Sequence, residues 1–141
     1  MKTGRYNIGV GLLGLAFFML YGFLMVYLRD FAPDAAAWAA SYGTGKHFES
    51  RLAHVHGALF SVLNVALGFV LAKLATASDR ARVTVAGLAL AGLLMPLGIL
   101  GEVYLGLSPV FVLVGAFAMT VSVATAGVLS LSHWAPDAAS T

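Results

Sequence analysis

Histidines and one carboxylate stand out among the long apolar runs of this sequence. His54 and His56 lie two positions apart at the start of one run, and His47 precedes them. Imidazole is a common ligand of zinc and of haem iron. Glu102 is the one acidic residue within the apolar runs, and an ionisable side chain is costly there, so it indicates a functional site. These residue types suggest metal or haem chemistry.

The elements that must position these side chains are membrane helices. The chain has 141 residues, of which 60% are hydrophobic and 10% are charged, whereas soluble domains have about 25% charged residues. A membrane-spanning helix needs about 20 mostly apolar residues. We predict four such helices, over residues 7–28, 52–74, 83–106 and 109–132. Pro96 predicts a kink in the third. We expect an all-α integral membrane protein, a four-helix bundle that forms a single transmembrane domain over residues 1–141.

The connection 29–51 is the one long segment between predicted helices. Pro33 suits a first helical position, alanines follow, and Gly43 suits a stop. Trp38 favours the membrane interface. We therefore expect a short interfacial helix within this loop, and a disordered tail after His133.

The distribution of Lys and Arg predicts the orientation of the bundle. The N-terminus and the connection after the second helix carry five basic residues, and the loop 29–51 carries three. This bias predicts that both termini are on the cytoplasmic side, as in a bacterial inner membrane. In either orientation, the second helix starts and the third helix ends at the same membrane face. His54 and His56 should therefore lie at about the depth of Glu102 and Tyr104.

His54 and His56 cannot face one site from the same helix, because at about 100° per residue they point about 200° apart. Small residues let helices or a flat ligand approach closely. The small residues that share the face of His54 are Gly57, Ser61 and Gly68. The bulky residues that share the face of His56 are Phe60, Leu63, Leu67 and Val70. We predict that the His54 face lies inside and the His56 face outside. Asn64 lies between them, about 15 Å along the axis from His54.

The residues are compatible with three kinds of role. In the first, His47, His54 and Glu102 bind zinc or iron. In the second, His54 binds haem iron, small residues leave room for the macrocycle, and cations pair its propionates. The small residues would be Gly57 and Ser61, and the cations Arg51 and Lys46. In the third, the histidines only contact lipid head groups and Glu102 only pairs helices.

Five short stretches match a known family. They are Ala53-His54 with a glycine soon after, Val70-Leu71, Asp79-Arg80-Ala81-Arg82, Val103-Tyr104-Leu105 and Ser108-Pro109. Together they resemble the styrene oxide isomerase family over roughly residues 50 to 110. The resemblance implies a four-helix membrane protein that binds haem b and converts aryl epoxides to aldehydes. It matches His54 to the haem ligand and Tyr104 to a substrate-facing tyrosine.

The resemblance implies Lewis-acid catalysis by ferric haem b without net redox. Tyr104, Asn64 and Glu102 are then the candidate catalytic residues, and the substrate is a small apolar molecule. The residues leave two alternatives open. One is a small b-type cytochrome, or another haem- or metal-binding membrane protein, in which His56 or His47 supplies a further ligand. The other is a non-catalytic accessory membrane subunit.

The expected partners follow from charge and size. A net charge of +2 without a clustered basic face does not indicate a nucleic-acid partner. Membrane lipid must surround the helices. A unit this small also suggests a homo-oligomer with a site between subunits.

Overall fold

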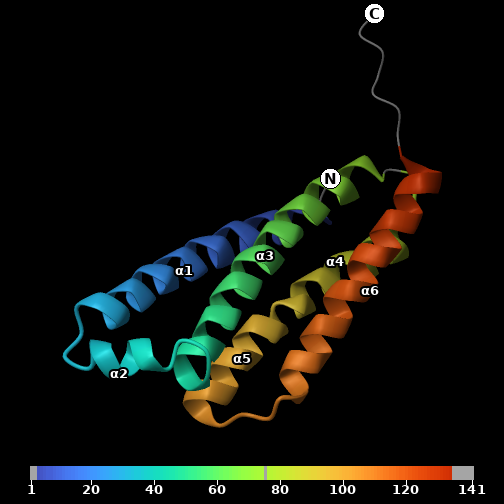
Figure 1. Cartoon of the computed structure of the whole chain (residues 1–141). Coiled ribbons are helices and arrows are strands. Elements are labelled where there is room, and N and C mark those ends of the chain that lie inside the picture. Colours follow the sequence, from blue (N-terminus) through green and yellow to red (C-terminus); the bar gives the residue numbers. More distant parts are fainter. Residues whose placement is uncertain (1–2, 75, 135–141) are drawn as a thin grey trace, which may run out of the picture.

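Helices make up most of the structure, a computed structural model that describes residues 3–74 and 76–134. Four spans are long and apolar enough to cross a membrane: Arg5–Asp30, Gly45–Lys73, Asp79–Leu105 and Val110–His133. The first is α1, the second α3 and the last α6, and the third consists of α4 (Asp79–Gly92) and α5 (Leu94–Leu105). The short α2 (Ala35–Ala40) follows α1 (Figure 1). The predicted all-α four-helix membrane bundle is confirmed. The predicted disordered tail concerns residues 135–141, which lie outside the described residues.

The long helix α3 lies in the middle of the bundle (Figure 1). It packs against α1 on one side and against α5 on the other, while α6 packs against α4 and α5. The apolar core includes Phe60, Leu67, Val85 and Met119. Because α3 has neighbours on two sides, the prediction that the face of His56 lies outside is wrong. Phe60 and Leu67 on that face are buried in the core.

Small residues bring α1 and α3 into close contact. A Cβ atom at Gly11 would lie 2.7 Å from the carbonyl oxygen of Ser61, and a Cβ atom at Gly57 would collide with the ring of Phe18. Gly57, Ser61 and Gly68 are all buried. The prediction that this face of α3 points inward is therefore confirmed, and its small residues serve close helix packing.

The third span is broken. Its first half ends at Gly92 and its second half starts at Leu94. The N–H of Leu93 donates to the carbonyl of Leu90 over 3.1 Å, which is a tighter turn than in an α-helix. Pro96 follows; it lacks an N–H, and its ring disfavours a regular helix at the carbonyl four residues earlier, that of Gly92. The one helix predicted for this span is therefore two.

The first connection is shorter than predicted. Because α3 starts at Gly45, the side chains of Lys46, His47 and Arg51 lie on a helix and not in a loop 29–51. The helix continues beyond its apolar run, so hydropathy did not reveal its first turns. The expected short helix in this connection is present as α2.

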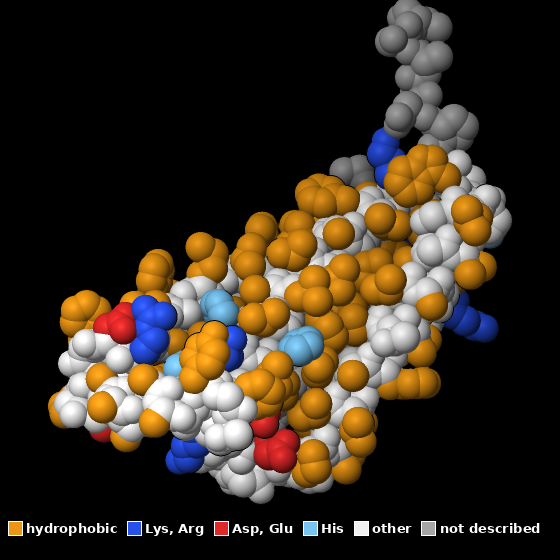
Figure 2. Space-filling model, in the orientation of Figure 1, with side chains coloured by type: hydrophobic (Ala, Val, Ile, Leu, Met, Phe, Trp, Pro, Cys, Tyr) orange, Lys and Arg blue, Asp and Glu red, His pale blue; other side chains and the backbone are white. Residues whose placement is uncertain are grey.

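Large apolar side chains cover much of the face shown in Figure 2. On α1, Leu13, Leu20 and Phe23 are 74%, 67% and 67% exposed. Soluble monomers rarely expose apolar patches of this extent, whereas helices with satisfied backbone groups are stable in lipid. The chain is an integral membrane protein.

Candidate functional site

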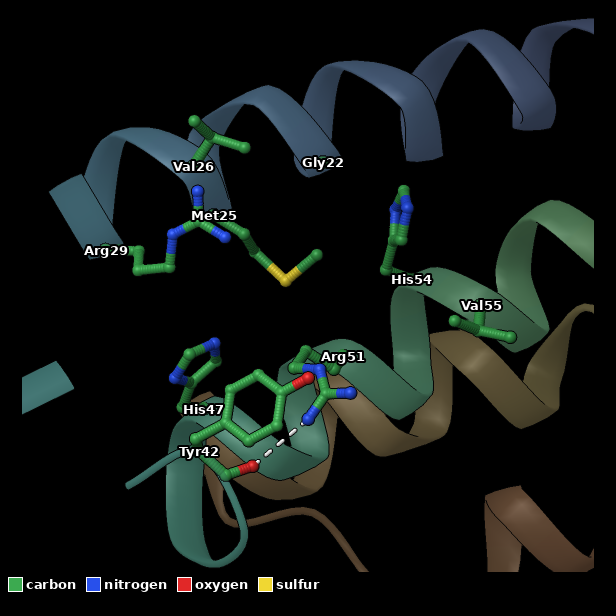
Figure 3. A pocket seen from close by; sticks show the side chains of 9 residues that line it. All are labelled: Gly22, Met25, Val26, Arg29, Tyr42, His47, Arg51, His54 and Val55. Atoms are coloured by element: carbon green, nitrogen blue, oxygen red, sulfur yellow. Dashed lines mark hydrogen bonds between the residues drawn. The ribbon is translucent and has the colours of Figure 1, made fainter. Parts of the chain in front are cut away.

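A cavity of about 270 Å³ opens between α1 and α3, beside the connection that carries α2 (Figure 3). Its walls combine imidazole, guanidinium and apolar side chains. They belong to Gly22, Met25, Val26, Arg29, Tyr42, His47, Arg51, His54 and Val55. Of the residues selected from the sequence, His54, His47 and Arg51 meet at this cavity.

A hydrogen bond to α1 fixes the side chain of His54. Its Nδ1 lies 2.8 Å from the carbonyl oxygen of Phe18. A carbonyl can only accept, so Nδ1 carries the proton, and Nε2 of the neutral ring keeps its lone pair. Metal-ligating histidines are oriented in this way. Gly22 leaves space for the ring, because a Cβ atom there would lie 2.7 Å from Cε1 and 3.3 Å from Nε2 of His54.

His47 lies at the opposite side of the cavity from His54 (Figure 3). It is 3% exposed, and its Nδ1 lies 2.9 Å from the carbonyl oxygen of Trp38. The Trp38 ring stacks on the imidazole at 4.9 Å between centroids, and the Tyr42 ring meets it edge-on at 5.3 Å. The same reasoning assigns the proton to Nδ1. Two imidazoles with defined tautomers therefore line one cavity.

Two guanidinium groups give the cavity a basic wall. Arg51 Cζ lies 3.7 Å from the centroid of the Tyr42 ring, and its Nη1 donates to the Tyr42 carbonyl over 3.2 Å. Arg29, at the end of α1, pairs with Asp30 through bonds of 2.8 and 2.6 Å. The sequence had suggested Lys46 instead of Arg29. Lys46 lies elsewhere, with its Nζ 6.0 Å from the centroid of the Tyr104 ring.

The hydroxyl of Tyr104 joins α5 to two other helices. It lies 2.8 Å from Ser50 Oγ on α3 and 3.3 Å from the hydroxyl of Tyr21 on α1. Ser50 is one helical turn before His54 on α3, but Tyr104 is not among the residues of the cavity wall. Ser50 and Tyr21 were not selected from the sequence, because only contacts between helices identify them.

Asn64 lies in another part of the bundle, where it joins α3 to α1 and α4. Its Nδ2 donates to the carbonyl of Ala89 over 2.9 Å and to that of Phe60 over 3.0 Å. Its Oδ1 accepts from Nδ2 of Asn7 over 3.0 Å. Asn64 is fully buried, and its bonds to Asn7 and Ala89 connect α3 to two other helices. Asn7 was missed in the sequence because nothing local relates it to a residue so far along the chain.

Glu102 and His56 also lie apart from the cavity. Glu102 is exposed on α5, and the described residues include no hydrogen-bond or ion-pair partner for its side chain. His56 Nδ1 bonds to the carbonyl of Leu52 in its own helix over 2.9 Å. Within residues 3–74 and 76–134, no three His, Asp or Glu side chains gather as metal ligands. The metal site built from His47, His54 and Glu102 is not formed.

The wall of the cavity fits part of a haem. An oriented Nε2 at His54 is a suitable iron ligand, and Arg29 and Arg51 suit carboxylates. The expectation that Gly57 and Ser61 leave room for the macrocycle is wrong, because α1 fills that space. The cavity is also smaller than the sites of about 300–1,000 Å³ that hold drug-sized ligands. A haem bound at His54 would extend beyond this cavity.

Comparisons with known proteins assign no family to the chain. No family model matches the chain, and neither a curated protein nor a solved structure matches it.

Proposed function

We propose that this membrane protein binds haem b through Nε2 of His54. One observation carries the proposal: Nδ1 of His54 bonds to the Phe18 carbonyl at a cavity wall that also contains Arg29 and Arg51. The bond selects the tautomer in which Nε2 has the lone pair that a metal ion needs. Guanidinium groups can pair with the propionates of a haem. The resemblance of His54 to the haem ligand of the styrene oxide isomerase family supports the same choice.

The reaction that we propose is the one implied by the resemblance, isomerisation of an aryl epoxide to an aldehyde. Bound ferric haem supplies a Lewis acid for the epoxide oxygen. Met25, Val26 and Val55 make the apolar part of the wall and exclude water from the reacting molecule. The Tyr104 hydroxyl, held by Ser50 one turn from the histidine, orients the substrate.

The proposed setting is a bacterial inner membrane with both termini in the cytoplasm. The basic residues support this orientation, five against three. Small apolar substrates enter from the lipid. The small volume of the cavity supports a homo-oligomer in which a second copy of the chain completes the haem site.

A b-type cytochrome is the second candidate, because His47 lines the same cavity as His54. Electron carriers close both axial positions of the iron with strong ligands. An isomerase needs one position open to the epoxide oxygen. The two candidates therefore differ in how the ferric protein responds to an added ligand.

Product analysis with styrene oxide tests the reaction. The purified ferric protein should form the aldehyde without reductant, oxygen or cofactor, and cyanide should change its absorption spectrum and inhibit it. Tyr104→Phe should slow conversion more than it weakens haem binding, while Tyr27→Phe, at an exposed tyrosine of α1, should leave both unchanged. If no aldehyde forms and cyanide does not change the spectrum, the isomerase is excluded and the cytochrome remains as the candidate. Failure of the protein to bind haem overturns both candidates.

A further inference from the structure

A second cavity lies between α1 and α4, and it is almost entirely apolar. Its volume is about 400 Å³, and its wall includes Tyr6 and Asn7 from α1 and Val83, Gly87 and Leu90 from α4. It shares no wall residue with the cavity at His54. No role assigned so far uses it.

The side-chain amide of Asn7 has one polar atom without a partner. Its Nδ2 donates to Asn64 Oδ1 over 3.0 Å and to the Ala86 carbonyl over 2.9 Å. Both of those atoms are acceptors, so a flipped amide would place its oxygen against two oxygens. The orientation is therefore defined, and Asn7 Oδ1 finds no donor among the described residues although the residue is fully buried.

An unpaired acceptor inside a membrane bundle costs free energy that a donor recovers. We propose that the α1–α4 cavity binds a neutral, lipid-soluble molecule with a hydroxyl group, which donates a hydrogen bond to Asn7 Oδ1. The apolar wall accommodates the rest of such a molecule. Asn7 is in the first turn of α1, near one end of the span. None of the described residues of the wall is charged, which favours a neutral ligand. This inference does not rest on the proposed haem function.

The composition of the chain offers a direct probe, because Asn7 and Asn64 are its two asparagines. The protein with uniformly ¹³C,¹⁵N-labelled asparagine, in lipid nanodiscs, should give two side-chain carbonyl signals. Carbonyl labelling of tyrosine identifies Asn7 through the Tyr6–Asn7 peptide bond. The probes are 1-dodecanol and 4-hexylphenol, each compared with its methyl ether at equal mole fraction in the lipid. At least one of the two hydroxyl compounds should shift the Asn7 signal downfield, and the ethers should not. The Asn64 signal should stay.

A cavity-filling variant supplies the matched control. No neighbouring atom lies within 4 Å of a Cβ atom placed at Gly87 or at Gly127. Gly87→Leu fills the cavity without removing the Asn7–Asn64 bond, and it should abolish the shift. Gly127→Leu, on α6, should keep it. If neither hydroxyl compound moves the Asn7 signal, or if Gly87→Leu responds like the unaltered protein, the inference is overturned and a buried water is the donor to Asn7. A shift with dodecanol alone or with the phenol alone supports the inference and identifies the ligand as aliphatic or aromatic.

Discussion

Two polar regions of the bundle differ in which polar atoms of their side chains form hydrogen bonds. In the region of Asn7 and Asn64, both N–H groups of each side chain are used. Three of these four bonds go to another helix, and the fourth, from Asn64 to the Phe60 carbonyl, stays within α3. In the region of His54 and His47, Nδ1 of each imidazole bonds to a backbone carbonyl, and Nε2 retains its lone pair. Polar side chains are costly in both places. The asparagines join helices, and the two histidines line a cavity.

The two regions also differ in their charge. Guanidinium groups of Arg29 and Arg51 accompany the histidines, while the described residues of the wall beside Asn7 carry no charge. Changes at His54 should therefore alter haem binding, and changes at Asn64 should alter stability. Substitutions in each region test that division.

The largest expected effect is on haem content. His54→Ala removes the proposed ligand, so the haem bound per chain should fall by about tenfold or more. His56→Ala should keep most of the haem, because His56 bonds within its own helix and lies off the cavity. The Soret absorbance per chain of the two purified variants shows which histidine holds the haem. Loss of haem in His56→Ala and retention in His54→Ala would reverse the assignment.

A substitution at Asn64 should affect stability instead. Asn64→Leu removes the bonds to Asn7, Ala89 and Phe60. Hydrogen bonds between membrane helices contribute about 0.6 kcal/mol on average and up to about 1.7, so we expect a loss of about 1–2 kcal/mol in the free energy of unfolding.

Denaturant unfolding of the haem-free protein in detergent measures this loss. Thr120→Val is the control, since Thr120 is exposed and bonds within α6; it should change the stability by less than about 0.5 kcal/mol. A haem spectrum altered by Asn64→Leu would show that the two regions are not separate in function.

A smaller effect should follow from one added methyl group beside His54. The Cβ atom of Gly22→Ala would lie 2.7 Å from Cε1 of the imidazole, which its bond to Phe18 holds in place. The ring must move, and haem affinity should fall about tenfold at most, in the lower range found for residues that orient a ligand. Gly9→Ala, where no neighbouring atom is within 4 Å of the new Cβ, should leave the affinity unchanged. Equal affinities of the two variants in haem titrations would contradict the placement of His54.

The smallest effect is expected at the cations. Arg29→Gln and Arg51→Gln should each weaken haem binding by up to about fivefold, because exposed ion pairs contribute about 0.2–1 kcal/mol. Lys46→Gln should have no effect, since Lys46 lies against Tyr104. Titrations at low and high salt check the cause, because added salt should reduce the difference between the arginine variants and the unaltered protein.

Hydropathy predicted the four spans, because each apolar run is as long as a bilayer is thick. It did not predict where α3 starts, since Lys46 and Arg51 lie on helical turns outside the apolar run. It also could not show that Pro96 separates two helices, because a proline in a membrane helix can bend the helix or break it.

The helical wheel predicted the inward face of His54 correctly, since the small residues on that face mark close packing with α1. It failed for His56, because a wheel shows the faces of one helix and not how many neighbours that helix has. Arg29 and Asn7 were missed for a related reason. The role of each depends on residues of another helix that lie beside it. The sequence alone does not fix how the helices are rotated against one another.

The most direct test of the account is the electron paramagnetic resonance spectrum of the ferric protein, recorded before and after adding cyanide. Ligation by His54 with the other axial position open predicts a high-spin spectrum that becomes low-spin with cyanide. His54→Gly should lose this spectrum and regain it when imidazole is added, because free imidazole can occupy the space of the missing ring. A low-spin spectrum that cyanide does not change, or an unchanged spectrum in His54→Gly without imidazole, would contradict the account.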